Sequence, residues 1–210
     1  MISLSEILHT IAQALMIPCL IILIILMAGA VWQIGDIVVE YIAERRKHKC
    51  NVPQLLRDVH AAGADGLAEL IENCGLLRRQ KKALLELAES RGLPKDTLTA
   101  LAERLLATEE ARNARTTSIT DMIAKLGPMF GLLGTLIPLG PGIVALGQGD
   151  TVTLSESMNV AFDTTIAGVI SAAVASVISH IRKRWYNDDM VSLETLMEAV
   201  LEEVTSDVEG

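Results

Sequence analysis

LGPMFGLLGT, residues 126–135, opens an uncharged apolar run that continues to residue 146. A run of about 20 such residues is long enough to cross the roughly 30 Å hydrocarbon core of a bilayer as a helix. Gly127, Gly131 and Gly134 are spaced four and three residues apart, so a groove of bare backbone lies along one face, where a second helix can approach closely. Thr135 adds a hydroxyl beside this groove. The stretch therefore predicts a membrane helix that packs tightly against its neighbours.

Two further segments reach the same length. Residues 7–35 contain no Asp, Glu, Lys or Arg, and residues 160–181 contain only Asp163. Hydropathy thus predicts three transmembrane helices and an all-α membrane protein. The first segment does not fit a secretory signal, because a signal begins with positive charge and no Lys or Arg precedes Arg45. We expect it to be retained as a membrane helix.

Basic residues mark one side of the membrane at each span. The three clusters are Arg45, Arg46, Lys47 and Lys49 after the first span; Arg112, Arg115 and Lys125 before the second; and Arg182, Lys183 and Arg184 after the third. The first ten residues and the segment 147–159 contain none. Because such residues stay on the cytoplasmic side, the N-terminus is expected outside and the C-terminus in the cytoplasm of a protein that crosses the cell (inner) membrane three times.

The spans and clusters predict four parts of the chain. These are an outer N-terminus with the first membrane helix (1–44), a cytoplasmic helical segment (45–125), a domain of the second and third membrane helices (126–181) and a cytoplasmic acidic C-terminal helix (182–210).

Within the cytoplasmic segment, residues that favour the starts and ends of helices predict three helices. Asn51 and Pro53 indicate the start of a first helix, and Gly63 its end. A second helix is expected from residue 65 to the break at 91–94. A third begins near Lys95 and continues into the second membrane span as one long helix.

Composition argues against an enzyme and against a nucleic-acid-binding protein. Hydrophobic residues make up 50% of the chain but aromatic residues only 3%, as expected for helices packed in lipid. Eight of the 26 acidic residues follow residue 187, and the remaining 18 balance the 18 basic residues, so no basic face remains for nucleic acid. The three cysteines form no CxxC pair, and no nucleophile–base pair or phosphate loop is present. No metal, cofactor or catalytic residue is predicted.

The third span carries a seam of small residues. Steps of four, three, four, three and four residues join Ala161, Thr165, Gly168, Ala172, Ala175 and Ser179. This heptad spacing favours close packing of helices. Thr165, like Thr135, therefore lies on a glycine-rich face. Two interpretations stay open for the two threonines: a polar ring inside the membrane, or hydroxyls that bond back to carbonyls of their own helices.

The stretch 127–135, followed about 30 residues later by Thr165-Ile166-Ala167-Gly168, resembles the MotA/TolQ/ExbB proton channel family. In that family a Pro-x-x-Gly-Leu-x-Gly-Thr stretch and an Ala-Thr-x-x-Gly stretch line the channel. The three-span topology, the large first cytoplasmic segment and the basic residues after the third span resemble the ExbB/TolQ branch most closely. The resemblance covers nearly the whole chain.

The resemblance implies a homopentamer whose inner helices surround single-span partners of the ExbD/TolR/MotB type. An aspartate of the partner would carry the proton, and Thr135 and Thr165 would line its route. Downhill flow supplies about 2.3 kcal/mol per 100 mV for each charge, which the family passes to the partner as movement. The implied function is a proton-channel (stator or motor) subunit. The alternative is a non-conducting pentameric membrane scaffold that holds a partner.

Two features depart from the family pattern. ExbB carries a glutamate five residues before the threonine that matches Thr165, and Val160 stands there in this chain. The nearest acid is Asp163, which is either an interfacial residue at the N-terminus of its helix, where the helix dipole favours negative charge, or an ion relay or subunit contact. Pro138 and Pro141 are expected to kink the outer half of the second span.

The charge asymmetry predicts that residues 45–125 are cytoplasmic and that the segment 147–159 is outside. On a background without native cysteines, Asp150→Cys is expected to react with a membrane-impermeant thiol reagent in intact cells. A chain that keeps only Cys50 is expected to stay unmodified. The reverse labelling pattern would overturn the predicted topology.

Overall fold

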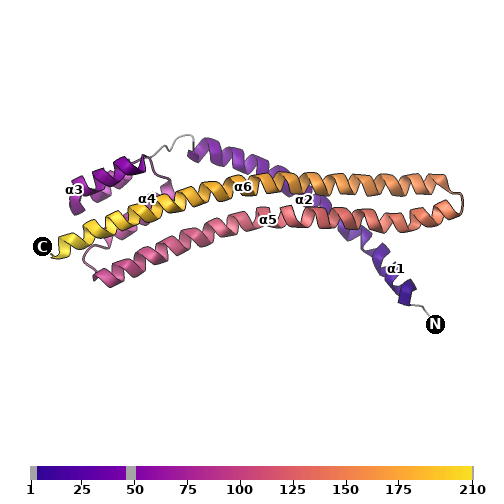
Figure 1. The fold of residues 1–210 in the computed structure, drawn as a ribbon, viewed down its shortest axis with the longest axis horizontal. Helices are drawn as coiled ribbons and strands as arrows, with labels where there is room; N and C mark the ends of the chain where they lie inside the picture. Colours follow the sequence, from indigo (N-terminus) through magenta and orange to yellow (C-terminus); the bar gives the residue numbers. More distant parts are fainter. Residues whose placement is uncertain (1–3, 46–50, 210) are drawn as a thin grey trace. The chain divides into compact units, whose positions relative to one another are not determined.

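The computed structural model describes residues 4–45 and 51–209, and all the regular structure in this part of the chain is helical (Figure 1). The helices are α1 (Leu4–Ala14), α2 (Met16–Glu40), the short π-helical turn η1 (Tyr41–Arg45), α3 (Val52–Asn73), α4 (Arg78–Glu89), α5 (Lys95–Gly147) and α6 (Thr151–Glu209). The predicted all-α fold is confirmed. Outside the described residues lie Arg46, Lys47, Lys49 and Cys50, all predicted to be cytoplasmic.

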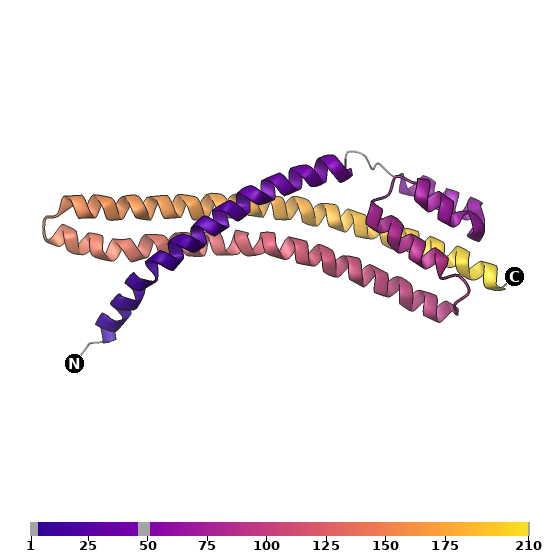
Figure 2. The same cartoon turned by 180° about the vertical axis from the view of Figure 1, so that it is seen from behind.

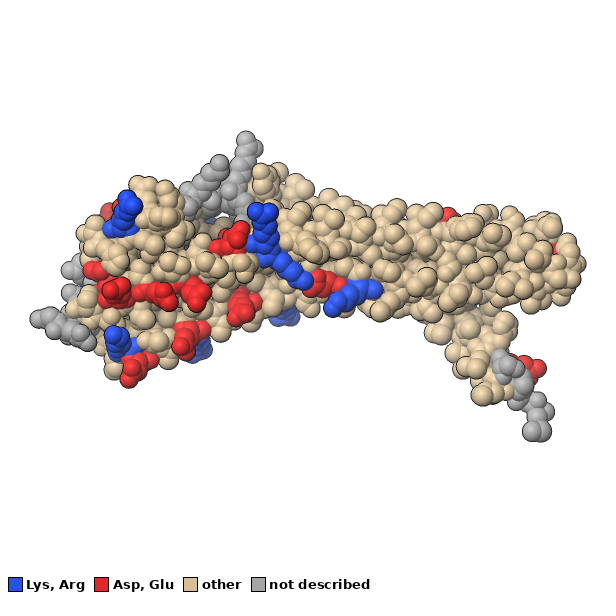
Figure 3. All heavy atoms as spheres, in the orientation of Figure 1, with Lys and Arg blue, Asp and Glu red and all other residues tan. Residues whose placement is uncertain are grey.

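Three helical stretches are long and apolar enough to cross a membrane, as predicted: Glu6–Ala43, Lys95–Gly147 and Thr151–Ser206. The chain leaves the helix at Leu15, between α1 and α2, because Pro18 has no N–H for the carbonyl of Ala14. α5 begins at Lys95, as predicted, and continues as one helix through Pro128, Pro138 and Pro141. Over the ends of α5 and α6 nearest their connection, the face shown in Figure 3 is almost free of charged side chains.

The connection between α5 and α6 is shorter than the predicted segment 147–159, because α6 already begins at Thr151. Asp150 caps α6: its carboxylate accepts hydrogen bonds from the N–H groups of Val152 (3.2 Å) and Thr153 (3.0 Å) and from the Thr153 hydroxyl (2.6 Å). The bond from the Thr153 hydroxyl is the largest cause that lowers the pKa of Asp150. Since Asp150 holds this cap, Gln148 is the better position for the labelling cysteine.

The chain divides into two compact units. Unit 1 comprises Met1–Asp36 and Thr117–Ile181, and unit 2 comprises Ile37–Thr116 and Arg182–Gly210. Both long helices therefore contribute to both units.

In unit 1, α2 packs on one side of the antiparallel pair formed by α5 and α6. Leu26 and Ala30 of α2 are buried against Ile123 of α5 and Ala175 of α6. Figures 1 and 2, which view the molecule from opposite sides, show α2 crossing this pair obliquely.

In unit 2, α3 folds back on itself at Gly63, the residue at which the sequence predicted the end of a helix. Gly63 has φ 62° and ψ 175°, a backbone conformation that favours glycine. The predicted single helix from residue 65 to the break at 91–94 is wrong, because α3 ends at Asn73 and α4 begins at Arg78. The turn between them contains Gly75 and carries Leu76 into the core, where it is 3% exposed.

The core of unit 2 joins both arms of α3 to α4, the first turns of α5 and the C-terminal part of α6. Its fully buried side chains include Val59, Leu67, Ile71, Leu84, Leu87, Leu98, Leu193, Leu196, Met197, Val200 and Val204. Gln80 adds a polar tie, since its Nε2 donates to the carbonyl of Asp189 at 3.0 Å.

A charged cluster fastens the end of α2 to α6 inside unit 2. Arg182 is only 3% exposed, and its Nε donates to Oε2 of Glu40 at 3.2 Å. Tyr41 stacks on Trp185 with ring centroids 6.1 Å apart. Burial first, and then the nearby Glu40 carboxylate, raise the pKa of Tyr186 to about 12. The cluster satisfies a charge that would be costly to bury alone.

The raised pKa of Tyr186 predicts a loss of stability at high pH. The folded chain keeps the phenol proton up to pH about 12, whereas the unfolded chain releases it near 10.0, so stabilisation present below pH 10.0 is lost as the pH rises through about 12. With Tyr41→Phe, Tyr186 is the only tyrosine, and its phenolate absorbance is expected to appear near pH 12. Adding Glu40→Gln is expected to lower this midpoint, and an unchanged midpoint would contradict the contact.

Candidate functional site

α5 and α6 pack backbone against backbone in unit 1. A Cβ atom placed on Gly168 would lie 2.5 Å from the carbonyl oxygen of Gly127 and 2.9 Å from the Cα of Gly131. A Cβ on Gly127 would lie 2.6 Å from the carbonyl oxygen of Gly168. Any side chain at these positions would force the two backbones apart, so glycine permits the observed separation.

Further contacts fix the antiparallel register along the pair. The facing residues are Gly142 and Ser157, Gly134 and Thr164, and Gly127 and Ala172. Beside this seam, the side chains of Asp121 and Ser179 meet in a hydrogen bond. Each step toward the N-terminus of α5 is matched, to within one residue, by a step toward the C-terminus of α6. The register therefore gives the relative depth of every residue in the two spans.

Thr164, which the sequence pattern did not single out, faces the glycine groove in place of Thr165. Thr164 is 5% exposed, and a Cβ on Gly134 would lie 2.6 Å from its Cβ. Thr165 is half-buried, one residue further along and so about 100° further around the helix. The seam of small residues thus predicted the correct face of α6, but the threonine at the contact is Thr164 and not Thr165.

The three threonine hydroxyls of this region donate to carbonyls of their own helices. Thr135 donates to Leu132 at 2.7 Å, Thr165 to Ala161 at 3.1 Å, and Thr164 to Ala161 at 2.9 Å. This is the local bonding that the sequence left open as an alternative to a polar ring. Each hydroxyl oxygen keeps lone pairs with which it can accept a hydrogen bond from water or from another chain.

Thr135 and Thr165 lie on the same side of the helix pair. Gly134 of α5 and Thr164 of α6 face each other, and Thr135 and Thr165 are the residues that follow them. In two antiparallel helices, the residues that directly follow a facing pair point to the same side of the helix pair. α2 packs on the opposite side of the helix pair. Val174 indicates this side, because it packs in the cluster with α2 and directly precedes, and does not follow, the buried contact residue Ala175. The two threonines therefore face away from α2.

Asp163 lies inside α6 and not at a helix end. α6 begins at Thr151, so Asp163 lies inside the helix and not beside its N-terminus, where the helix dipole favours a negative charge. Asp163 directly precedes Thr164, which faces Gly134 of α5. Gly134 lies roughly 12 Å along α5 from residue 126 and roughly 18 Å from residue 146, the two ends of the uncharged run. Its side chain is exposed and turns to the side opposite Thr135 and Thr165.

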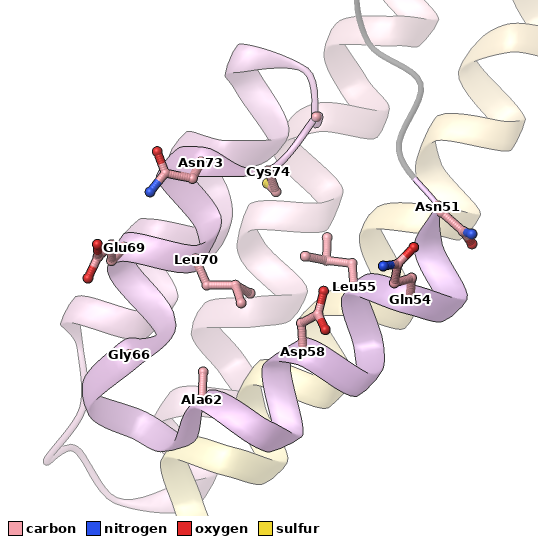
Figure 4. A pocket seen from close by; sticks show the side chains of 11 residues that line it. Asn51, Gln54, Leu55, Asp58, Ala62, Gly66, Glu69, Leu70, Asn73 and Cys74 are labelled. Atoms are coloured by element: carbon pink, nitrogen blue, oxygen red, sulfur yellow. The ribbon is translucent and has the colours of Figure 1, made fainter.

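Unit 2 contains a hollow between the two arms of α3 (Figure 4). Leu55 and Leu70 point toward each other across it, whereas Glu69 and Asn73 point away from it. Its carboxylates, from Asp58 and Glu69, are both exposed. The hollow therefore brings no set of polar groups together around a ligand.

The comparison with protein families identifies the membrane part of the chain. The model of the MotA/TolQ/ExbB proton channel family matches residues 73–195. This range contains the packed parts of α5 and α6 with their glycine seam, and the threonines Thr135, Thr164 and Thr165. The chain belongs to the MotA/TolQ/ExbB proton channel family. No curated protein matches it. As a MotA/TolQ/ExbB protein it is a proton-channel-type subunit of a transport family, and its three apolar helices are consistent with the ExbB/TolQ branch.

The glycine contacts predict unequal effects of one added methyl group. Gly168→Ala is expected to destabilise this MotA/TolQ/ExbB protein by about 1–3 kcal/mol, because the new Cβ meets backbone atoms that cannot move aside singly. Gly140→Ala is the matched control, since no atom lies within 4 Å of a Cβ there. Thermal unfolding in detergent measures both. Equal unfolding temperatures for the two variants would contradict the close contact.

Proposed function

We propose that this chain is a stator (motor) subunit that couples ion-motive force to movement of a single-span partner of the ExbD/TolR/MotB type. It acts as a homopentamer in the cytoplasmic membrane, with its N-terminus outside and its C-terminus in the cytoplasm. One observation carries the proposal: the family match includes both helices that place Thr135 and Thr165 on one side of a rigid pair.

In this proposal, Thr135 and Thr165 line the ion path, and another chain supplies the titrating carboxylate. Between residues 126 and 146 and between 160 and 181, Asp163 is the only acid, and it turns to the other side of the helix pair. A lone ionised acid in mid-membrane costs on the order of 3 kcal/mol on insertion scales, so it is retained where polar groups meet it. The two hydroxyls provide such groups for a partner's aspartate.

Asp163 serves as a subunit contact in the same proposal. Its depth in the span makes exposure to lipid costly, and its direction away from the threonines separates it from the path they line. A neighbouring copy in the pentamer would meet it with polar groups. Gly127, Gly131, Gly134, Gly168 and Ala172 act as helix-packing residues within each copy, which keeps the helix pair rigid.

The second candidate function is the non-conducting pentameric scaffold. Val160 favours it, because this chain has an apolar side chain where ExbB has a glutamate. The back-bonded hydroxyls of Thr135 and Thr165 are also compatible with a purely structural role. Ion flux distinguishes the two functions.

Thr135→Val and Thr165→Val are each expected to abolish partner-dependent proton flux in reconstituted vesicles while the native mass of the complex stays unchanged. Valine nearly matches threonine in shape but removes the hydroxyl. Thr195→Val is the matched control, because its hydroxyl also donates to its own helix, at 2.8 Å to Val191, but outside the span. Asp163→Asn is expected to reduce flux less than either valine substitution.

Flux unchanged by both valine substitutions but lost with Asp163→Asn would move the path to Asp163. No flux through the unmodified complex would favour the scaffold. A stable monomer or dimer of the unmodified chain would contradict the pentamer.

A further inference from the structure

A carboxylate–hydroxyl pair joins α5 to α6 near the end of unit 1. The Ser179 hydroxyl donates to Oδ1 of Asp121 across the two helices, at 2.5 Å. Ser179 is 3% exposed and Asp121 is half-buried. Such a short O–H to carboxylate distance is typical of a charge-assisted hydrogen bond. Ser179 thus differs from Thr135, Thr164 and Thr165, whose hydroxyls donate within their own helices.

Asp121 and Ser179 lie at the same spacing along their helices from the two threonines Thr135 and Thr165. Asp121 lies 14 residues before Thr135, and Ser179 lies 14 residues after Thr165. Fourteen residues are two heptads, so in a helix pair with heptad packing both residues return to the side that carries the threonines. The distance along each helix is about 21 Å. The pair therefore lies on the proposed path, at the end next to the basic cluster that begins at Arg182.

A buried hydroxyl beside this pair points independently to a ligand. Thr120 is 0% exposed, and its Oγ1 has no hydrogen-bond partner. Ala124 and Thr120 continue the glycine seam of α5 beyond Gly127, at the same spacing of three and four residues. Thr120 therefore faces α6, at the level of Ser179. A buried hydroxyl without a partner is costly unless water or an ion meets it. Asp121, Ser179 and Thr120 together supply oxygen atoms for a hydrated proton.

We propose that Asp121, held in place by Ser179, is the carboxylate at which protons leave the membrane path on the cytoplasmic side. A proton arriving through water forms an O–H bond to an Asp121 oxygen as its bond to the donor water breaks. Asp121 then passes the proton to a cytoplasmic water molecule and returns to the carboxylate form. This inference rests on the proposed function, and it adds a titrating group that belongs to this chain and not to its partner.

The test is proton flux in vesicles that contain the full pentamer with its co-purified single-span chain. Asp121→Asn is expected to lower the flux by about tenfold or more with the native mass of the complex unchanged, since the amide cannot carry the proton. Asp121→Glu keeps a carboxylate and is expected to retain most of the flux. Ser179→Ala, which removes the hydrogen bond from the Ser179 hydroxyl to the carboxylate, is expected to give an intermediate loss. Glu103→Gln removes an exposed carboxylate from the same helix and is the matched control.

The outcomes separate this inference from the proposed function. No flux through the unmodified complex would overturn the proposed function and this inference with it. Normal flux through both the unmodified complex and Asp121→Asn would overturn this inference alone. So would equal losses of flux in Asp121→Asn and Asp121→Glu, because a pair with only a structural role does not distinguish an amide from a carboxylate.

Discussion

The approach of the Gly127 and Gly168 backbones is the constraint on which the rest of unit 1 depends. Lipid tails are as apolar as leucine, so helices in a bilayer gain their association from close packing more than from the hydrophobic effect. With no side chain between them at this point, α5 and α6 are held in one register. That register decides which residues turn toward α2, which turn away from it, and how deep each residue lies.

The same register sorts the polar residues of the helix pair by side. Asp163 turns to the side on which α2 packs, whereas Thr135, Thr165 and the Asp121–Ser179 pair share the opposite side. Thr135, Thr165, Asp121 and Ser179 thus lie along one side of the helix pair. The structure of a single chain accounts for this separation without any contact from a second copy.

The sequence predicted those features that depend on long patterns or on residues with special backbone geometry. The three apolar helices, the uninterrupted α5 and the fold of α3 at Gly63 are of this kind. The start of α6 was missed because residues 151–159 are polar and lack a strong apolar period, and the cap that begins the helix depends on the side chain of Asp150. The break before α4 was missed because it depends on the burial of Leu76 in a core built from distant segments.

At the site itself, the sequence predicted the glycine seam but placed Thr165 on it in place of Thr164. Adjacent residues differ by about 100° around a helix, and a seam of small side chains tolerates a rotation of that size until a partner helix fixes it. The Asp121–Ser179 pair joins residues 58 positions apart, which no local pattern brings together. Its spacing of two heptads from Thr135 and Thr165 is nevertheless visible in the sequence once the antiparallel packing is known.

The stack of Tyr41 on Trp185 has a spectroscopic consequence. The chain has two tryptophans, and Trp32 belongs to unit 1 whereas Trp185 belongs to unit 2. Replacing either one leaves a single tryptophan, whose emission reports on one unit alone. Because Trp185 lies against Tyr41, its emission and its energy transfer from tyrosine respond directly when η1 separates from α6. The native residues therefore provide an optical probe of motion in unit 2 without an attached label.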